Sequence, residues 1–296
     1  MQNSAIMEFA SSDSWTILSS LEQSIKRKID AIGTPLRDWN ISINYGIKTG
    51  FNDAFIISGE LKDQLIALDQ KSAEIIRPIL RGRDIKRYGY SFADLWLINA
   101  HNGIKDKSIA RVEISDYPAI KAHLDTCYEK LAKRADKGDT PYNLRNCAYM
   151  DDFSKQKIVF AETMRVHRTQ GADRFPRFSF VEEGFFQDKT CFMITGNDLY
   201  YILAIINSSL MNYYIHKNVA VLDTGGFLMQ KIYVDCFPVP RVHEETYEKL
   251  TELSKEIVKR RKTNTDSFDL EDQVDSIVYE IFCLTDKEIR FIQENI

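Results

Sequence analysis

Short apolar runs and alternating apolar positions dominate the middle of the chain, from about residue 40 to 240. Runs of three to six such residues, bounded by glycine, proline or polar clusters, are typical of β-strands. They predict at least seven strands, at 41–45, 54–57, 95–98, 157–162, 178–181, 191–194 and 232–234. Pro238 and Pro240 are expected to end the last of these strands.

Apolar residues at three- to four-residue spacing predict helices around these strands. One helix is expected to follow Ser14 as its N-cap, to bury Ile25 and Ile29, and to end at Gly33. Another helix, 199–215, is apolar around nearly its whole circumference, which predicts a position inside the molecule. A third is expected at 117–134, with a buried face formed by Ile120, Leu124, Tyr128 and Leu131.

The chain changes character after Pro240, where it is rich in charge and contains no proline or glycine. Two amphipathic stripes, 247–258 and 270–282, predict a helical hairpin, and Thr285 with Glu288 predicts a capping box for a final helix. We therefore divide the chain into a lead-in that is expected to be flexible, a body that contains the predicted strands and a C-terminal helical arm, at 1–14, 15–240 and 241–296.

The order of these elements predicts the fold class. Strands interrupted by one buried helix and several amphipathic helices indicate an α/β fold of mixed α+β type. The prediction is a mixed-sheet body with a C-terminal helical extension. The 296 residues, 44% of them hydrophobic, are enough to bury a sizeable core.

Charge and cysteine content exclude several classes of protein. The formal net charge of −4 argues against a uniformly basic nucleic-acid-binding protein but allows a local basic face. The five cysteines are scattered without a Cys-x-x-Cys pair, so neither a disulfide framework nor a zinc knuckle is indicated. No apolar run of membrane-spanning length and no signal-peptide pattern is present. A cytoplasmic location without a membrane partner is therefore predicted.

The most distinctive basic stretch is 76–88, in which five basic residues fall within eleven positions. The planar guanidinium of arginine fits a phosphate or a guanine edge, and Gly82 allows a close approach of the main chain to a partner. The alternative is that Arg83 and Asp84 pair locally and only fix a turn. DNA contacts are predicted from four residues of this stretch: Arg81, Arg83, Lys86 and Arg87.

Two further loops add candidate contacts to DNA. The loop 46–50 contributes Lys48 and Thr49, but it lacks the Gly-x-x-x-x-Gly-Lys-Ser/Thr spacing, so nucleotide binding is not predicted. The loop 217–227 contributes Lys217 and Thr224. Together with the arginine-rich stretch, the loop that contains Lys48 is expected to contact phosphates and to place the protein on the duplex.

A second basic cluster lies between the strands predicted at 157–162 and 178–181. Arginine can bind guanine through two hydrogen bonds, which makes loop arginines good candidates for base contacts. Base reading is assigned to Arg165, His167, Arg168 and Arg174, and Arg177 is expected to contact DNA beside them.

No metal or nuclease site is predicted. The five histidines show no ligand spacing. Asp53 with Glu60 and Lys62 imitates the acidic signature of a nuclease, but Glu-x-Lys is common by chance and its distance from Asp53 is short.

Five motifs in a fixed order carry a resemblance to a known family: 46–55, 76–85, 157–159, 203–208 and 237–240. Together they resemble the TaqI-like specificity domain, the C-terminal target-recognition part of adenine-N6 DNA methyltransferases and of fused type II restriction-modification enzymes. The resemblance runs from about Trp15 to the C-terminal end, where 274–279 and 284–289 are similar to the closing helices of that family.

The resemblance implies a module that recognises double-stranded DNA together with an adenine-N6 methyltransferase domain or subunit, in cis or in trans. The chain contains neither the glycine-rich adenosylmethionine loop nor the Asn-Pro-Pro-Tyr motif of those enzymes, so neither catalysis nor a cofactor is expected in it. S-adenosylmethionine, and Mg²⁺ in an endonuclease, would belong to the partner domains. The rival interpretation is a protein-interaction or scaffold subunit whose basic loops are only solvated.

Overall fold

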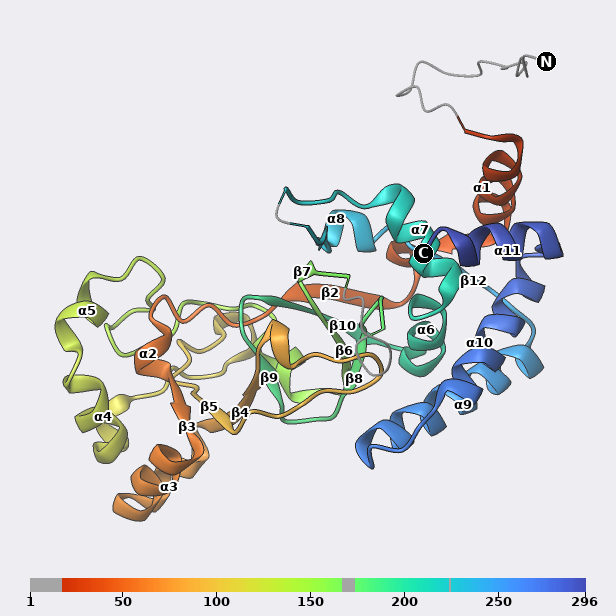
Figure 1. Cartoon of the computed structure of the whole chain (residues 1–296). Coiled ribbons are helices and arrows are strands. Elements are labelled where there is room, and N and C mark those ends of the chain that lie inside the picture. Colours follow the sequence, from red (N-terminus) through yellow and green to blue (C-terminus); the bar gives the residue numbers. More distant parts are fainter. Residues whose placement is uncertain (1–17, 167–173, 224) are drawn as a thin grey trace.

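The computed structural model describes residues 18–166, 174–223 and 225–296 (Figure 1). The first helix, α1 (Ser20–Ile32), is preceded by Ser19, whose side chain accepts a hydrogen bond from the Glu22 amide while the Glu22 carboxylate accepts one from the Ser19 amide. This capping box places the helix start five residues beyond the predicted cap, so the prediction of Ser14 is wrong. Gly33 follows the last helical residue, as predicted. The predicted lead-in, 1–14, lies outside the described residues.

Two four-stranded sheets form the centre of the described part of the chain. The first is antiparallel throughout, in the order β2 (Ile41–Tyr45), β10 (Cys191–Gly196), β6 (Lys157–Ala161) and β8 (Ser179–Val181). The second has the order β3 (Ile56–Ser58), β5 (Leu95–Ile98), β4 (Ile76–Leu80) and β9 (Phe186–Gln187), in which only the β4–β9 pair is parallel. The mixed-sheet prediction is therefore confirmed.

Two small strand pairs join distant parts of the chain. One pairs β1 (Gly33–Pro35) with β12 (Pro238–Pro240), and the other pairs β7 (Thr163–Met164) with β11 (Phe227–Leu228). The pairing of β12 shows that the proline-rich segment continues in extended conformation, although it was expected to end a strand.

Strand β6 explains why this segment is apolar without alternation. Ile158 and Phe160 are buried in one hydrophobic cluster, whereas Val159, between them, is buried in the other. Side chains of a strand point alternately to the two faces of its sheet, so both faces of this sheet are covered. The sheet therefore separates two hydrophobic cores.

The core that contains Val159 and the second sheet is covered by short helices. These are α2 (Asn52–Phe55), α3 (Gly59–Leu68), α4 (Pro118–Asp125) and α5 (Tyr128–Lys133), on the left in Figure 1. The single helix predicted at 117–134 is thus two helices, and Tyr128 is 43% exposed rather than buried. Ile120, Leu124 and Leu131 are buried as predicted.

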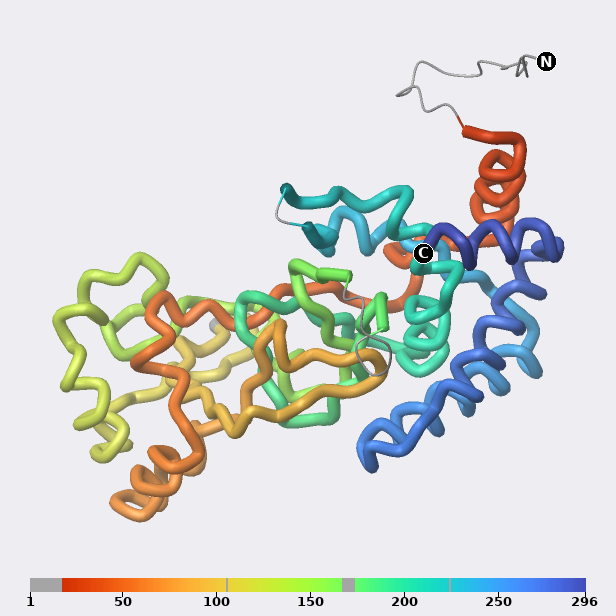
Figure 2. The backbone as a smooth tube through the Cα atoms, in the orientation of Figure 1, coloured from red at the N-terminus to blue at the C-terminus, as the bar shows by residue number. Residues whose placement is uncertain are grey.

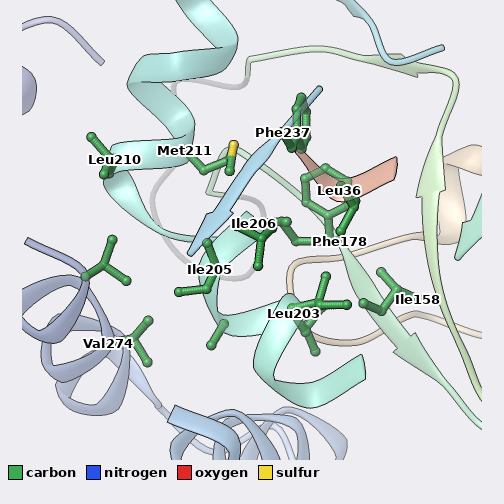
Figure 3. Close-up of a cluster of buried hydrophobic side chains, with 14 of the residues drawn as sticks. Leu36, Ile158, Phe178, Leu203, Ile205, Ile206, Leu210, Met211, Phe237 and Val274 are labelled. Carbon is green, nitrogen blue, oxygen red and sulfur yellow. The ribbon is translucent and has the colours of Figure 1, made fainter. Parts of the chain in front are cut away.

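The other core is built around α6 (Leu199–Ile206) and α7 (Ser209–Asn218) (Figure 3). The single buried helix predicted at 199–215 is interrupted because Asn207 turns its side chain to the backbone of Phe178. The Phe178 amide donates to Asn207 Oδ1, and Asn207 Nδ2 donates to the Phe178 carbonyl, both at 3.0 Å. Ser208 then caps α7 by accepting from the Met211 amide at 3.2 Å.

The C-terminal helices pack on the same core. Helices α9 (Glu244–Lys262), α10 (Phe268–Ile281) and α11 (Asp286–Glu294) bury their apolar stripes in the cluster that holds α6. The predicted capping box of Thr285 and Glu288 is confirmed. The division of the chain at residue 240 stays a prediction.

The strand predicted at 232–234 is wrong, because these residues lie in the short helix α8 (Lys231–Val234), where Ile232 is 70% exposed. Its apolar side chains follow neither of the two periodicities over a long enough stretch to distinguish strand from helix. Within the described ranges, none of the helices combines the length and the hydrophobicity needed to cross a membrane.

Candidate DNA interface

The arginine-rich stretch forms the strand β4 and then a tight turn, the 3₁₀ helix η3 (Gly82–Asp84). Gly82 donates its amide to Thr190 Oγ1 at 2.9 Å, and a Cβ atom on Gly82 would lie only 3.1 Å from the same oxygen. The close approach that glycine permits here is therefore to the connection between β9 and β10, within the protein.

Arg81 and Asp84 hold this turn together. Arg81 Nε and Nη2 each donate to the Asp84 carboxylate at 2.9 Å, and the Arg81 amide donates to it at 2.8 Å. These hydrogen bonds raise the pKa of the Arg81 guanidinium. Arg83 is exposed and has no ion-pair or hydrogen-bond partner among the described residues. The alternative of an Arg83–Asp84 pair is therefore wrong: Arg81 fixes the turn, and Arg83 is available to a ligand.

The Arg87 side chain is buried and hydrogen-bonded within the protein. It is 5% exposed, its Nε donates to Glu271 Oε2 at 2.6 Å, and its Nη1 donates to the Pro176 carbonyl at 3.1 Å. Arg261 Nη2 donates to the other oxygen of Glu271, also at 2.6 Å. Burial raises the pKa of Glu271, but the two guanidiniums outweigh burial and hold that pKa below its usual value. Arg87 thus anchors the loop to α10, and its predicted contact with DNA is withdrawn.

The fold brings the two predicted basic clusters side by side. A Cβ atom on Gly82 would lie 3.3 Å from Ala161 Cβ, at the end of β6 where the second basic segment begins. At the other end of that segment, the Phe178 carbonyl accepts a hydrogen bond from the Tyr88 amide at 2.8 Å. Both ends of the loop 82–88 therefore touch the ends of the segment 162–178, although about eighty positions separate them in the sequence.

The second cluster contains both exposed and buried cations. Arg165 is exposed, and its carbonyl accepts a hydrogen bond from Arg177 Nη2 at 2.7 Å. Arg177 is only 8% exposed, which makes it a structural residue rather than a contact to DNA. The half-buried Arg174 lies with its guanidinium carbon 5.0 Å from the centre of the Phe268 ring, at the start of α10. His167 and Arg168 lie outside the described residues.

The structure shows no contact between the two basic segments and the remaining candidates that it describes, which are Lys48, Thr49 and Lys217. Lys48 is half-buried, with its ammonium 4.9 Å from the centre of the Tyr45 ring, and Thr49 is 1% exposed and accepts a hydrogen bond from the Phe51 amide at 3.2 Å. The side chain of Thr49 is therefore structural, and its predicted contact is withdrawn. Lys217 on α7 forms an ion pair of 2.8 Å with Glu22 on α1, which lowers the pKa of Glu22 to about 2. Thr224 is not among the described residues.

The sequence interpretation missed the contribution of the C-terminal end of α9. Arg261 forms an ion pair with Glu271, and Lys262 forms one with Glu182 beside β8. A Cβ atom on Gly89 would lie 3.4 Å from Arg261 Cβ, so the loop after the arginine-rich stretch packs directly on this helix. A local sequence pattern cannot predict this contact, because 172 positions separate Gly89 from Arg261.

The lysine of the nuclease-like set Asp53, Glu60 and Lys62 contacts residues outside that set. Lys62 pairs with Asp63 at 2.9 Å and lies 4.2 Å from the centre of the Trp96 ring. The part of the chain that the structure describes contains no group of three or more histidine, cysteine or acidic residues arranged to hold a metal ion.

Comparisons with known proteins agree with this architecture. The fold is similar to part of MmeI, a Type IIL restriction-modification enzyme solved in complex with DNA, with a TM-score of 0.63 and 16% identity over 89% of this chain and 36% of that chain. The type IIG restriction endonuclease BpuSI aligns with a lower TM-score of 0.49 and 11% identity, over 88% of this chain and 32% of that chain. The chain thus spans about a third of each of these enzymes.

Sequence comparison identifies the family. The Type II methyltransferase M.MjaIV of Methanocaldococcus jannaschii is 24% identical over 253 residues, which cover 80% of this chain and 77% of that relative. The family model of the TaqI-like C-terminal specificity domain matches residues 77–239, more than half of the chain. The chain therefore belongs to the family of TaqI-like C-terminal specificity domains, as its motifs indicate.

Proposed function

We propose that this chain is the sequence-specific DNA-recognition module of a restriction-modification system and that it positions duplex DNA for an adenine-N6 methyltransferase domain, in cis or in trans. The observation that carries the proposal is the contact between two basic segments within the region that matches the specificity-domain family. These segments contain Arg83, Lys86, Arg165 and Arg174, and we call their surface the basic face. A local face of this kind is compatible with a net charge of −4.

The roles within this face follow from exposure. Arg83 and Lys86 sit on the turn and loop next to the sheet, where contacts to phosphates would set the orientation of the duplex. Arg165 and Arg174, from the second segment, are the candidates for base edges. The two segments are held in place by three arginines that bind within the protein. These are Arg81, which binds Asp84, Arg87, which binds Glu271, and Arg177, which binds the Arg165 carbonyl.

Binding to duplex DNA at several salt concentrations tests the proposal. The affinity should fall steeply as salt rises, and Arg83→Ala should weaken binding to all sequences and reduce the slope of log K against log [salt] by about 0.9. Arg290→Ala is the matched control, since Arg290 is an exposed arginine on α11 without a described partner. A flat salt dependence of the wild-type chain would favour the scaffold interpretation instead.

Base reading has a different signature. Arg165→Ala should relax the preference at a single base pair, with a discrimination loss of about 1–3 kcal/mol, while affinity for unrelated duplex changes little. Selection of bound sequences from a randomised duplex library measures this preference position by position. An unchanged sequence preference would remove Arg165 from the set of base-reading residues.

The proposal also assigns catalysis to a partner. We expect the isolated chain to show neither binding of S-adenosylmethionine, nor methyl transfer, nor cleavage, and to restore methylation when combined with a methyltransferase domain. In titration calorimetry, stoichiometric micromolar binding of S-adenosylmethionine to the 296-residue chain would contradict this division of labour.

A further inference from the structure

The Phe268 ring, at the start of α10, carries arginines from two distant segments. The guanidinium carbon of Arg174 lies 5.0 Å from the centre of the ring, and that of Arg261 lies 5.5 Å from it. Figure 2 shows the amber loop, which follows β4, extending toward the α9–α10 hairpin at the blue end of the chain, where Gly89 packs on Arg261. The C-terminal helices therefore contact both segments of the basic face.

The two arginines differ in what their N–H groups bind. Arg261 Nη2 donates to the Glu271 carboxylate at 2.6 Å, so this guanidinium is fixed within the protein. Arg174 is half-buried and forms neither a hydrogen bond nor an ion pair with any residue that the structure describes. A guanidinium holds five N–H donors in one rigid plane, so those of Arg174 remain available to a ligand while the ring holds the plane.

A nearby carboxylate adds to this orientation without binding the donors. Burial raises the pKa of Asp275, and the positive charges of Arg87 and Arg174 oppose this rise, which places Arg174 within electrostatic range of α10. The Asp275 carboxylate, however, accepts hydrogen bonds from the amide and the hydroxyl of Ser209, the first of them at 2.7 Å. Arg174 is therefore attracted to α10 but keeps its hydrogen-bonding capacity.

Such an arrangement suits an arginine that reads a base. Two of its N–H groups must lie in the plane of the guanine edge, which a freely rotating side chain reaches only by losing conformational entropy. A guanidinium that a ring already holds loses less of this freedom on binding. The orientation of Arg174 in the free protein therefore contributes directly to how strongly it discriminates between bases.

We propose that Phe268 is a positioning residue for base reading and that its ring holds the Arg174 guanidinium in the orientation that binds the edge of a guanine. The inference rests on the proposed function and extends the determinants of specificity to the C-terminal helices. Phe268 acts through Arg174 and not through a contact of its own with DNA. Its effect is therefore confined to the base pair that Arg174 reads.

Selection of bound sequences from a randomised duplex library tests the proposal. Arg174→Ala should lower the discrimination at one base pair by about 5- to 100-fold. Phe268→Leu keeps an apolar side chain but removes the ring, so it should lower the discrimination at the same base pair by about threefold to fivefold. Phe268→Tyr keeps the ring face and should restore the discrimination of the wild type.

Phe291→Leu is the matched control. Phe291 is partly buried on α11, where its ring lies 6.2 Å from the Tyr213 ring and carries no cation from the described residues. This variant should leave the discrimination at every base pair unchanged. Thermal melting shows whether each variant keeps the fold, and Phe268→Met replaces Phe268→Leu in the selection if the leucine variant does not fold.

A double variant that combines Arg174→Ala with Phe268→Leu separates positioning from a general structural role. If the ring acts through the arginine, the double variant discriminates no worse than Arg174→Ala alone, because no guanidinium is left to position. Effects that multiply in the double variant would overturn the proposal. A loss of affinity in Phe268→Leu that is equal for all sequences would overturn it as well.

The same selection distinguishes failure of this inference from failure of the proposed function. A wild-type chain that binds without any sequence preference would overturn both. A clear preference that neither Arg174→Ala nor Phe268→Leu changes at any base pair would remove the positioning role and leave the proposed function standing.

Discussion

Replacement of Glu271 by glutamine should lower the free energy of unfolding by about 3–5 kcal/mol, the range measured when one partner of a buried ion pair is removed. The Glu271 side chain is 2% exposed and serves Arg87 and Arg261, each at 2.6 Å, and Ser267 Oγ at 3.2 Å. In the variant, the neutral amide leaves the Arg87 guanidinium, 6% exposed, without a counter-ion. The amide nitrogen, itself a donor, also faces a guanidinium donor.

Urea unfolding measures this loss, and Glu256→Gln provides the control. Glu256 is 43% exposed and pairs with Lys259 and Arg260 on the same helix, so its loss should cost at most about 1 kcal/mol. An equal, small loss in both variants would refute the view that Glu271 anchors the arginine-rich loop to α10.

The pH dependence provides a second measurement on the same residue. Because the folded pKa of Glu271 lies below its unfolded value, near 4.5, the unfolded chain binds the additional proton on acidification. The stabilising contribution is present above that pH and is lost as pH falls through the folded pKa. The difference between wild type and Glu271→Gln should therefore shrink below about pH 4.5, and a difference that grows on acidification would contradict the assignment.

Three further variants test the fold around the site. Burial lowers the pKa of Lys157 from its usual value of 10.5 to about 7, so the unfolded chain binds more protons between these pH values. The stability of wild type relative to Lys157→Met should therefore rise with pH across that window, as measured by urea titrations at each pH. Asn207→Ala leaves the Phe178 amide unpaired and removes one of the two hydrogen bonds to the Phe178 carbonyl, which keeps its bond from the Tyr88 amide. The variant should lose about 1–3 kcal/mol in unfolding experiments, against less than about 1 kcal/mol for the exposed control Asn218→Ala. Arg81→Ala should lose about 1–3 kcal/mol through the lost pair with Asp84 and lower the melting temperature, whereas Arg83→Ala leaves the melting temperature unchanged.

The residues of the basic face could be predicted only in part, and the wrong predictions share one cause. The sequence identified the two arginine-rich segments, but it treated Arg81, Arg83 and Arg87 as equivalent. Asp84 is three positions from Arg81, whereas the partner of Arg87 lies 184 positions away. A guanidinium becomes structural or available according to whether a carboxylate reaches it, and that depends on distant parts of the chain.

Local patterns were sufficient where the determining contacts lie within one element. The stripes of α9 and α10, the capping box of Thr285 and Glu288, and the apolar run of β6 arise from spacings of three to four residues or from burial on both faces of a strand. Each was visible in the sequence because side chains a few positions apart share a helix face or alternate along a strand. The five ordered motifs likewise identified the family before the fold was known.

Only the tertiary structure decided where the elements break and what they assemble. The helix predicted at 199–215 ends at Ile206 because Asn207 meets the backbone of Phe178, 29 positions earlier. Gly89 packs against Arg261, 172 positions later, a contact that the spacing within neither segment predicts. Hydrogen bonds and charge pairs of this kind depend on which backbone segments the two cores bring together, and the periodicity of a single segment contains no information about that.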